Sequence, residues 1–337
     1  MNSCLFPSPT AAELGGTCSI YNGLRRIKTT ELDEAPPTCT KCEDRPSVYF
    51  RPYSGERLCR GCFRDSIRER VEKTISRFKM FEHDSRIAVG VSGGKDSLGL
   101  LHILKRIEEH FPRSELVAVS IDEGVSGYRD EALSIAREAC GSLGVEHVVL
   151  SFDGLFGVTM DEIARRQREL GTCSYCGVLR RRALNEGAKM VGADRLATAH
   201  NLDDMAQTAL LNFLRGDTRR LATMHPAGNS FPGFVRRVKP FCEVPEREST
   251  LYAYLEGFRF QETPCPYASE AMRSDVRGFL NRMEVKRPGS KFIVYRTALK
   301  LIPGIETEGI QGRCSVCGEP TTGEVCRVCQ LVSQMRD

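Results

Sequence analysis

The stretch Ser92-Gly93-Gly94-Lys95-Asp96-Ser97 stands between a short apolar run at residues 86–91 and a helical pattern at 97–110. A strand that runs into a helix through two glycines is typical of a phosphate-binding turn, because bare backbone N–H groups can point at an anion. The N-terminus of the following helix adds a partial positive charge. We therefore expect residues 92–97 to bind the phosphates of a nucleotide.

Each side chain of this loop has a plausible use beside phosphate. Ser92 and Ser97 can donate hydroxyl groups, Lys95 can offset charge, and Asp96 can hold Mg²⁺ or order the loop. The spacing of a Walker A motif is absent. The alternative is an ordinary turn between a strand and a helix, but the order of strand, motif and helix favours phosphate binding.

Around this loop, apolar runs alternate with helical patterns. We expect strands at 86–91, 116–121, 145–150 and 195–199, and helices at 97–110, 128–143, 158–170, 178–191 and 202–215. Strands separated by helices of this length predict βαβ units, and hence an α/β fold with a doubly wound parallel sheet. Beyond Gly216 the pattern weakens to a loop at 222–234 and helices at 245–256 and 268–283.

The bulk composition is that of an ordinary globular chain. The 337 residues are 41% hydrophobic and 27% charged, with a net charge of +4, which permits a polyanionic partner without requiring one. Neither a transmembrane run nor a secretory signal is present, so we expect a cytoplasmic protein without a membrane partner. In that reducing compartment, the 15 cysteines are expected to be metal ligands or reactive thiols.

Basic residues occur in short clusters, which are either solvated helix faces or contacts for a phosphate backbone. The clusters are Arg165, Arg166 and Arg168; Arg180, Arg181 and Arg182; Arg219 and Arg220; and Arg236, Arg237 and Lys239.

Two sets of four cysteines have the spacing of structural zinc sites. They are Cys39-x2-Cys42-x16-Cys59-x2-Cys62 and Cys314-x2-Cys317-x8-Cys326-x2-Cys329. Four thiolates leave no open position on Zn²⁺, so both sites are predicted to be structural rather than catalytic. Arginines near the first set could also contact RNA, with pure scaffolding as the alternative.

Three further cysteines carry candidate chemistry. Cys173 and Cys176 form a CxxC pair that we place between two helices, and Cys265 stands between two prolines. Three thiols without a nearby histidine suit an iron–sulfur cluster with one open iron, or a redox-active thiol set. Buried structural cysteines are the alternative.

Residues 92–97 resemble the PP-loop of the N-type ATP pyrophosphatases, which cleave ATP between the α and β phosphates and adenylate a carbonyl oxygen. The segments at 120–130, 173–182 and 200–204 resemble the tRNA 2-thiouridine synthetases. The similarity is closest to the wobble-uridine thiolases of the cytoplasmic tRNA 2-thiolation protein 1 group, and covers roughly residues 38–290. The C-terminal cysteine module resembles that of the uridine-54 thiolases.

The resemblance implies a [4Fe-4S] cluster on Cys173, Cys176 and Cys265, although direct persulfide chemistry on these cysteines stays open. It also implies a nucleotide site lined by Arg180 and Ala199. We expect Gly90 to belong to this site, and the adenine to lie near Ile121 at the end of the second strand. Asp204 could orient the base or transfer a proton, or it could equally cap its helix.

The expected reaction begins with attack of a tRNA uridine C2 oxygen, flipped out of its loop, on the α phosphate of ATP. Pyrophosphate leaves, and sulfur then displaces AMP from C2. The sulfur donor stays open between sulfide, a persulfide and a ubiquitin-like thiocarboxylate, and a homodimer is possible by analogy. The rivals are thiolation of uridine 54 or of a cytidine, lysidine synthesis, and a non-catalytic zinc-bearing RNA-binding adaptor.

We expect four regions along the chain. These are a disordered extension at 1–36, an N-terminal zinc module at 37–66, a catalytic PP-loop domain at 67–300 and a C-terminal zinc ribbon at 301–337. Cys4 and Cys18, in the extension, are assigned no role.

Overall fold

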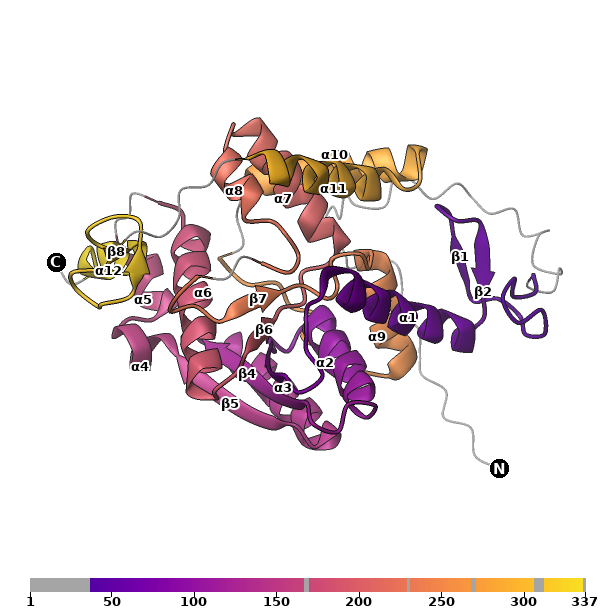
Figure 1. Ribbon diagram of the computed structural model, residues 1–337, viewed down its shortest axis with the longest axis horizontal. Coiled ribbons are helices and arrows are strands. Elements are labelled where there is room, and N and C mark those ends of the chain that lie inside the picture. Colours follow the sequence, from indigo (N-terminus) through magenta and orange to yellow (C-terminus); the bar gives the residue numbers. More distant parts are fainter. Residues whose placement is uncertain (1–36, 167–169, 229–230, 268–270, 306–311, 336–337) are drawn as a thin grey trace, which may run out of the picture.

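The computed structural model describes residues 37–166, 170–228, 231–267, 271–305 and 312–335 (Figure 1). The expectations for residues 1–36, with Cys4 and Cys18, and for Arg168 lie outside the described residues. Among the described helices, none combines the length and the hydrophobicity that a membrane span needs.

The centre of the fold is a five-stranded sheet in the order β5-β4-β3-β6-β7, and every neighbouring pair is parallel. This confirms the predicted α/β fold. The strands are β3 (Arg86–Gly90), β4 (Glu115–Asp122), β5 (Glu146–Ser151), β6 (Arg195–Ala197) and β7 (Arg236–Val238).

The sequence analysis missed β7. This strand has three residues, and two of them are arginines, so it has none of the apolar character that marks a buried strand. Only its pairing with β6, where Leu196 lies opposite Arg237, makes it part of the sheet.

Helices cover both faces of the sheet (Figure 1). In chain order they are α2 (Lys95–Glu108), α3 (Arg129–Leu143), α4 (Phe152–Phe156), α5 (Met160–Arg165), α6 (Thr172–Met190), α7 (Leu202–Leu214) and α8 (Thr218–Ala222). Side chains that alternate along β3 enter two different cores: Ile87 and Val89 pack on one face, and Ala88 on the other.

One placement differs from the expectation and concerns the site. The CxxC pair does not lie between two helices, because Cys173 and Cys176 belong to the first turns of α6. The helix starts at Thr172 after Gly171, and the buried residues Tyr175 and Leu179 begin its apolar stripe four residues apart. The sequence analysis placed the start of this helix at residue 178, six residues after its actual start at Thr172.

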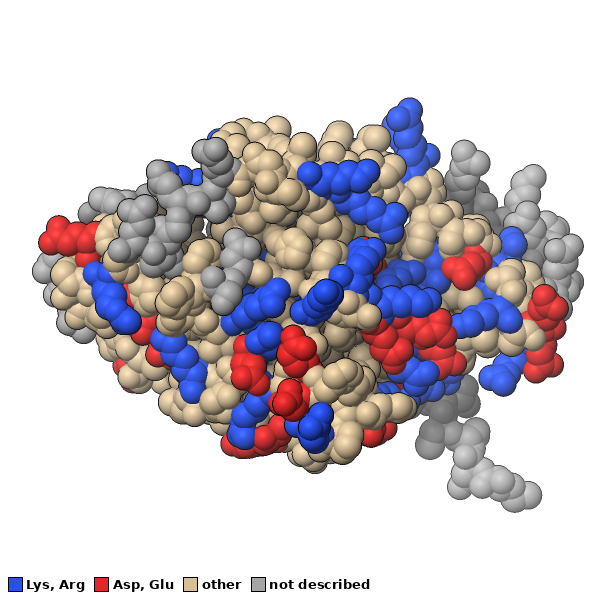
Figure 2. All heavy atoms as spheres, in the orientation of Figure 1, with Lys and Arg blue, Asp and Glu red and all other residues tan. Residues whose placement is uncertain are grey.

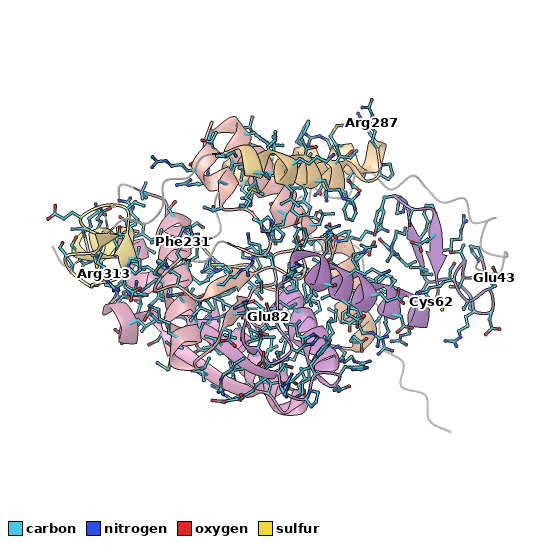
Figure 3. All side chains as sticks on the ribbon, in the orientation of Figure 1. Glu43, Cys62, Glu82, Phe231, Arg287 and Arg313 are labelled. Atoms are coloured by element: carbon cyan, nitrogen blue, oxygen red, sulfur yellow. The ribbon has the colours of Figure 1, made fainter. Side chains whose placement is uncertain are left out.

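The two cysteine modules lie at opposite ends of the molecule, which Figure 3 marks by Cys62 and Arg313. The first comprises β1 (Tyr49–Arg51), β2 (Glu56–Leu58) and the start of α1 (Arg60–Phe78); α1 packs on α9 (Glu246–Glu256). The second comprises β8 (Gly312–Arg313), β9 (Pro320–Thr321) and α12 (Arg327–Ser333), which packs on α6.

Two helices, α10 (Ala271–Lys286) and α11 (Ser290–Leu301), pack against α7, and η2 (Ile302–Gly304) follows them. The sequence analysis expected α10 but missed α11.

Candidate functional site

A cavity of about 700 Å³ opens at the carboxyl edge of the sheet, where parallel α/β folds bind their ligands. Among the residues that line it are ten of the predicted nucleotide and catalytic positions: Gly90, Ser92, Gly94, Lys95, Asp96, Ser97, Ile121, Arg180, Ala199 and Asp204. The fold therefore brings residues that are more than a hundred positions apart in the sequence, such as Gly90 and Asp204, to one cavity.

Gly93 does not line this cavity, but it sets the shape of the loop. Its φ is +83°, and a Cβ built on it would lie 2.3 Å from the carbonyl oxygen of Ala132 in α3. Neither the conformation nor the space admits a side chain here. Helix α3 thus forms a close backing for the loop.

The two serines of the loop bind the loop itself. Ser97 Oγ accepts from the Ser92 N–H at 3.1 Å and donates to the Gly94 carbonyl at 2.9 Å. Ser92 Oγ accepts from the Gly94 N–H at 3.3 Å. These bonds close the turn around the start of α2 and give the loop a defined shape.

Helix α9 controls the two charged residues of the loop. Lys95 Nζ lies 2.7 Å from Asp96 Oδ2 and 3.5 Å from Glu246 Oε1. Burial opposes the charge of Lys95, but the attraction of Asp96 and Glu246 raises its pKa above the usual value. The other oxygen of Asp96 accepts a hydrogen bond from Ser249 Oγ. Asp96 therefore has a fixed orientation that suits a metal ligand.

An ion-pair network around the buried carboxylate of Glu123 joins the end of β4 to Cys176. Arg129 Nε lies 2.8 Å from Glu123 Oε2 and donates to the Ile121 carbonyl at 2.6 Å. Arg180 Nε pairs with the other oxygen of Glu123 at 2.7 Å. A second nitrogen of Arg180, Nη2, lies 3.2 Å from Cys176 Sγ. Arg180 therefore contacts both the nucleotide cavity and a sulfur ligand candidate.

The three candidate cysteines lie near Arg180, close enough for Cys173 and Cys265 to affect the charge of Cys176. The Cys173 thiol donates to the Tyr267 carbonyl at 3.1 Å, two residues beyond Cys265. Burial raises the pKa of Cys176 to about 11; Arg180 opposes this shift, and the nearby Cys265 and Cys173 add to it. A thiol in this environment is protonated until a metal or a stronger cationic field stabilises the thiolate.

The terminal cysteines form two compact tetrads. In each, four Sγ atoms lie within 4.8 Å of one another, and the described residues contain no other such group of three or more metal-binding side chains. Backbone N–H groups point at the sulfurs; Cys326 N, for example, lies 3.2 Å from Cys314 Sγ. The Sγ atoms of Cys173, Cys176 and Cys265 do not all lie within 4.8 Å of one another.

Asp204 and Asp203 have different roles in the fold. Asn201 caps α7, and Asp204 Oδ2 accepts a hydrogen bond from the Asn201 N–H at 3.1 Å. The two bonds form a capping box. Asp204 also faces the cavity, and burial raises its pKa to about 6. Asp203 instead binds Lys291 of α11 and the N–H of Glu246. Asp203 is a structural link, whereas Asp204 combines its cap with a position in the site.

The sequence analysis missed several residues that line the cavity or contact the charged side chains of its loop. Glu123 and Arg129 fall in a segment that we quoted, but without a role, and Glu246 and Ser249 lie in a helix with no recognisable motif. An aromatic pair, Tyr254 and Phe260, also lines the cavity. The sequence shows which residues are acidic or basic, but only the tertiary structure shows which of them are buried and which residues they contact.

Comparison with known proteins agrees with this geometry. Residues 66–284 match the PP-loop domain family, and residues 38–64 match the N-terminal LIM domain of the 2-thiouridine synthetase TtuA. A probable sulfurtransferase of Methanocaldococcus jannaschii is 33% identical and covers 95% of this chain and 92% of its own. The cytoplasmic tRNA 2-thiolation protein 1 of Xenopus laevis is 35% identical, covering 88% of each chain.

A solved structure, the U34-tRNA thiolase NcsA from Methanococcus maripaludis with its [4Fe-4S] cluster, has a TM-score of 0.79 and 35% identity. The alignment covers 88% of this chain and 96% of that one. The tRNA 2-thiolation protein NcsA of Haloferax volcanii is 37% identical, covering 88% of this chain and 98% of its own. The chain therefore belongs to the PP-loop family, within the group formed by cytoplasmic tRNA 2-thiolation protein 1 and NcsA.

Proposed function

We propose that this chain catalyses the ATP-dependent 2-thiolation of a uridine in tRNA. One observation supports this most directly: Arg180 lies in the cavity of the phosphate loop and also contacts Cys176. One side chain thus joins the proposed nucleotide site to the proposed sulfur site, as a reaction that adenylates an oxygen and replaces it by sulfur requires.

In the first half of the reaction, residues 92–97 hold the ATP phosphates and the apolar wall at Ile121 and Ala199 holds the adenine. The uridine C2 oxygen attacks the α phosphate, and pyrophosphate leaves with the electrons of the broken P–O bond. Lys95 stabilises the charge that develops on the phosphates. Mg²⁺ fits Asp96, whose carboxylate Ser249 orients, and when bound it would neutralise phosphate charge.

In the second half, a sulfur nucleophile attacks C2, and AMP departs with the former C2 oxygen. Asp204, with its pKa raised to about 6, can exchange a proton near neutral pH. Cys173, Cys176 and Cys265 fit a [4Fe-4S] cluster with one open iron, which when bound would supply a site for sulfide. The alternative is a persulfide on one of these cysteines, and the donor is sulfide, a persulfide or a ubiquitin-like thiocarboxylate.

Both terminal tetrads fit one Zn²⁺ each. Hydrogen bonds from backbone N–H groups stabilise thiolate, and in the first tetrad they lower the pKa of Cys39 to about 6 against the opposing effect of burial. The ions would hold short modules that have little core of their own, so their role is structural.

The relatives support finer assignments. Position 34 of tRNA is favoured over position 54 or a cytidine, because the similar NcsA structure is that of a U34-tRNA thiolase. We further propose a cytoplasmic protein, by analogy with the relatives of that name. A homodimer is an additional proposal, made by analogy alone.

The test is a reconstituted reaction with undermodified tRNA, ATP and sulfide, followed by nucleoside analysis and AMP measurement. We expect 2-thiouridine at position 34 and one AMP for each thiolation. Cys265→Ser should abolish thiolation and leave two zinc ions per chain. The matched control Cys140→Ala removes a buried thiol of the core and should leave thiolation intact.

The same assay tests the second candidate, a non-catalytic RNA-binding adaptor. That protein would bind tRNA but release neither AMP nor pyrophosphate. The ordered phosphate loop argues against it, because a pure adaptor needs no such anion site. Absence of tRNA-dependent AMP release from the metal-loaded wild-type protein would refute the enzyme.

A further inference from the structure

Four basic residues near the cavity form no ion pair with a carboxylate of the described residues. We name them the β7 cation cluster: Arg181, Arg237, Lys239 and Arg273. Among the ion pairs found in the described part of the chain, none includes a member of this cluster. Their neighbours differ: Arg180 pairs with Glu123 at 2.7 Å and Arg182 with Glu319 at 2.8 Å.

The sheet brings Arg237 and Lys239 of the cluster close to residues that line the cavity. Because β7 pairs with β6, the Thr198 N–H donates to the Val238 carbonyl at 2.9 Å, so that Lys239 lies beside the segment that carries His200. Arg237 reaches from the same strand to the Arg181 carbonyl of α6 at 3.3 Å. The Nε atom of Arg237 is buried and, among the described residues, has no hydrogen-bond partner.

The charges of the cluster converge on one point. His200 lines the cavity with a solvent-exposed side chain; desolvation by the cavity walls and the positive charges of Lys239, Arg237, Arg273 and Arg181 all act to lower its pKa. Burial, followed by repulsion from Arg237, likewise lowers the pKa of Lys239 to about 8. Figure 2 shows Lys and Arg side chains near the centre of this face, in the region where Figure 1 draws β7.

Such an arrangement costs free energy unless an anion joins it, because like charges at partly buried positions repel one another. The phosphates of ATP already have a place on residues 92–97, at the end of β3. In the sheet, β6 lies between β3 and β7, and His200 follows β6. Arg237 and Lys239, in and directly after β7, are therefore separated from the phosphate loop, which follows β3, by the segment that carries His200. We therefore expect a second anionic group to bind beside the opening of the cavity.

We infer that the β7 cation cluster binds a phosphodiester group of the RNA strand next to the nucleotide that enters the cavity. This rests on the proposed function, since it assumes an RNA substrate. Guanidinium groups bind phosphate oxygens in pairs, and phosphate contacts fix the register of a strand without reading its sequence. The cluster would thus position the target nucleotide, and its members are positioning residues.

The experiment measures tRNA binding to the metal-loaded full chain by fluorescence anisotropy over a range of salt concentrations. Arg237→Gln and Lys239→Gln should each weaken tRNA binding about 10-fold to 100-fold, the effect of losing a charged hydrogen bond. Each should also make the slope of log K against log salt shallower by about 0.7 to 0.9. The matched control is Arg86→Gln, which removes an arginine that is paired with Glu115 and lies at the amino end of β3, away from the cavity. The tRNA affinity of this variant should stay within about 2-fold of wild type.

A second measurement, ATP affinity on the same variants, separates the possible ligands. Unchanged ATP affinity with weakened tRNA binding supports the inference. Weakened binding of ATP or pyrophosphate with unchanged tRNA binding would assign the cluster to the nucleotide and overturn it. Arg237→Lys and Lys239→Arg keep the charge and should restore most of the tRNA affinity, which a mere folding defect would not allow.

The outcome is also independent of the proposed function. If the wild-type protein binds tRNA through the cluster but does not thiolate it, the function fails and the RNA site stands. If the wild-type protein thiolates tRNA and the two Gln variants bind it as tightly as wild type, the RNA site fails alone.

Discussion

Replacing Gly93 by alanine should disable the nucleotide site without unfolding the protein. A Cβ at this position would lie 2.3 Å from the Ala132 carbonyl oxygen, whereas ordinary contacts begin at 3.4 Å. The loop or α3 must therefore move by about 1 Å. The positive φ of +83° adds about 1 to 2 kcal/mol of backbone strain for a residue with a side chain.

A shift of this size moves the donors of residues 92–97 away from the phosphates. Misplacement of binding groups by about 1 Å can reduce a rate by about 100-fold, which corresponds to about 2.7 kcal/mol. We expect kcat/KM for ATP in tRNA-dependent AMP release to fall by that factor. The free energy of unfolding in urea should fall by only about 1 to 3 kcal/mol, since the loop is one turn of a large core.

The matched control is Gly127→Ala. Gly127 has a similar φ of +69°, but a Cβ there would meet nothing within 4 Å. It should therefore show the backbone strain without the displacement, and keep kcat/KM for ATP within about 5-fold of wild type. If Gly93→Ala and Gly127→Ala lose equal ATP efficiency, or if Gly93→Ala binds ATP like wild type, the contact with Ala132 does not shape the loop.

Three further predictions concern buried charges. Glu248→Ala removes the carboxylate that binds Arg51 at 3.0 Å and Arg70 at 3.1 Å, and should cost about 3 to 5 kcal/mol in urea unfolding; a loss below about 1 kcal/mol would contradict it. In the folded protein the pKa of Asp204 is raised to about 6, so wild type loses free energy of unfolding as pH rises from about 4 to 6 and Asp204 ionises. Asp204→Asn should not show this loss, so its free energy of unfolding should increase relative to that of wild type over this range. Parallel pH profiles of the two proteins would refute this. Lys239 has a pKa of about 8 beside Arg237, Cys242 and His200, so tRNA affinity should fall from pH 7 to 9 in wild type but not in Lys239→Arg.

The predictions that succeeded rest on signals that are local in the sequence. The phosphate loop needs only a strand, two glycines and a helix in succession, and each terminal tetrad has its ligands within 24 residues. In such motifs, the residue types and their spacing are enough to predict the local structure. The parallel sheet follows for a related reason, since alternating apolar strands and helices have few ways to bury their surfaces.

The errors have physical causes as well. The strand β7 is short and basic, so it has no hydrophobic signal and exists only by pairing with β6. The start of α6 was placed too late because Cys173 and Cys176 occupy the positions where an apolar stripe would be read. In both cases tertiary contacts, rather than local preference, set the boundary.

By itself, the sequence determined the loop at residues 92–97 between a strand and a helix, the two tetrads and the three cysteines proposed for sulfur chemistry, because these depend on residue type and spacing. Only the tertiary structure decided what surrounds them. It placed Ser249 and Glu246 of α9 in contact with Asp96 and Lys95, and it left the β7 cation cluster without an ion pair in the described part of the chain. These contacts join segments far apart in the chain, and their electrostatics depend on burial, which arises only when the whole core has packed.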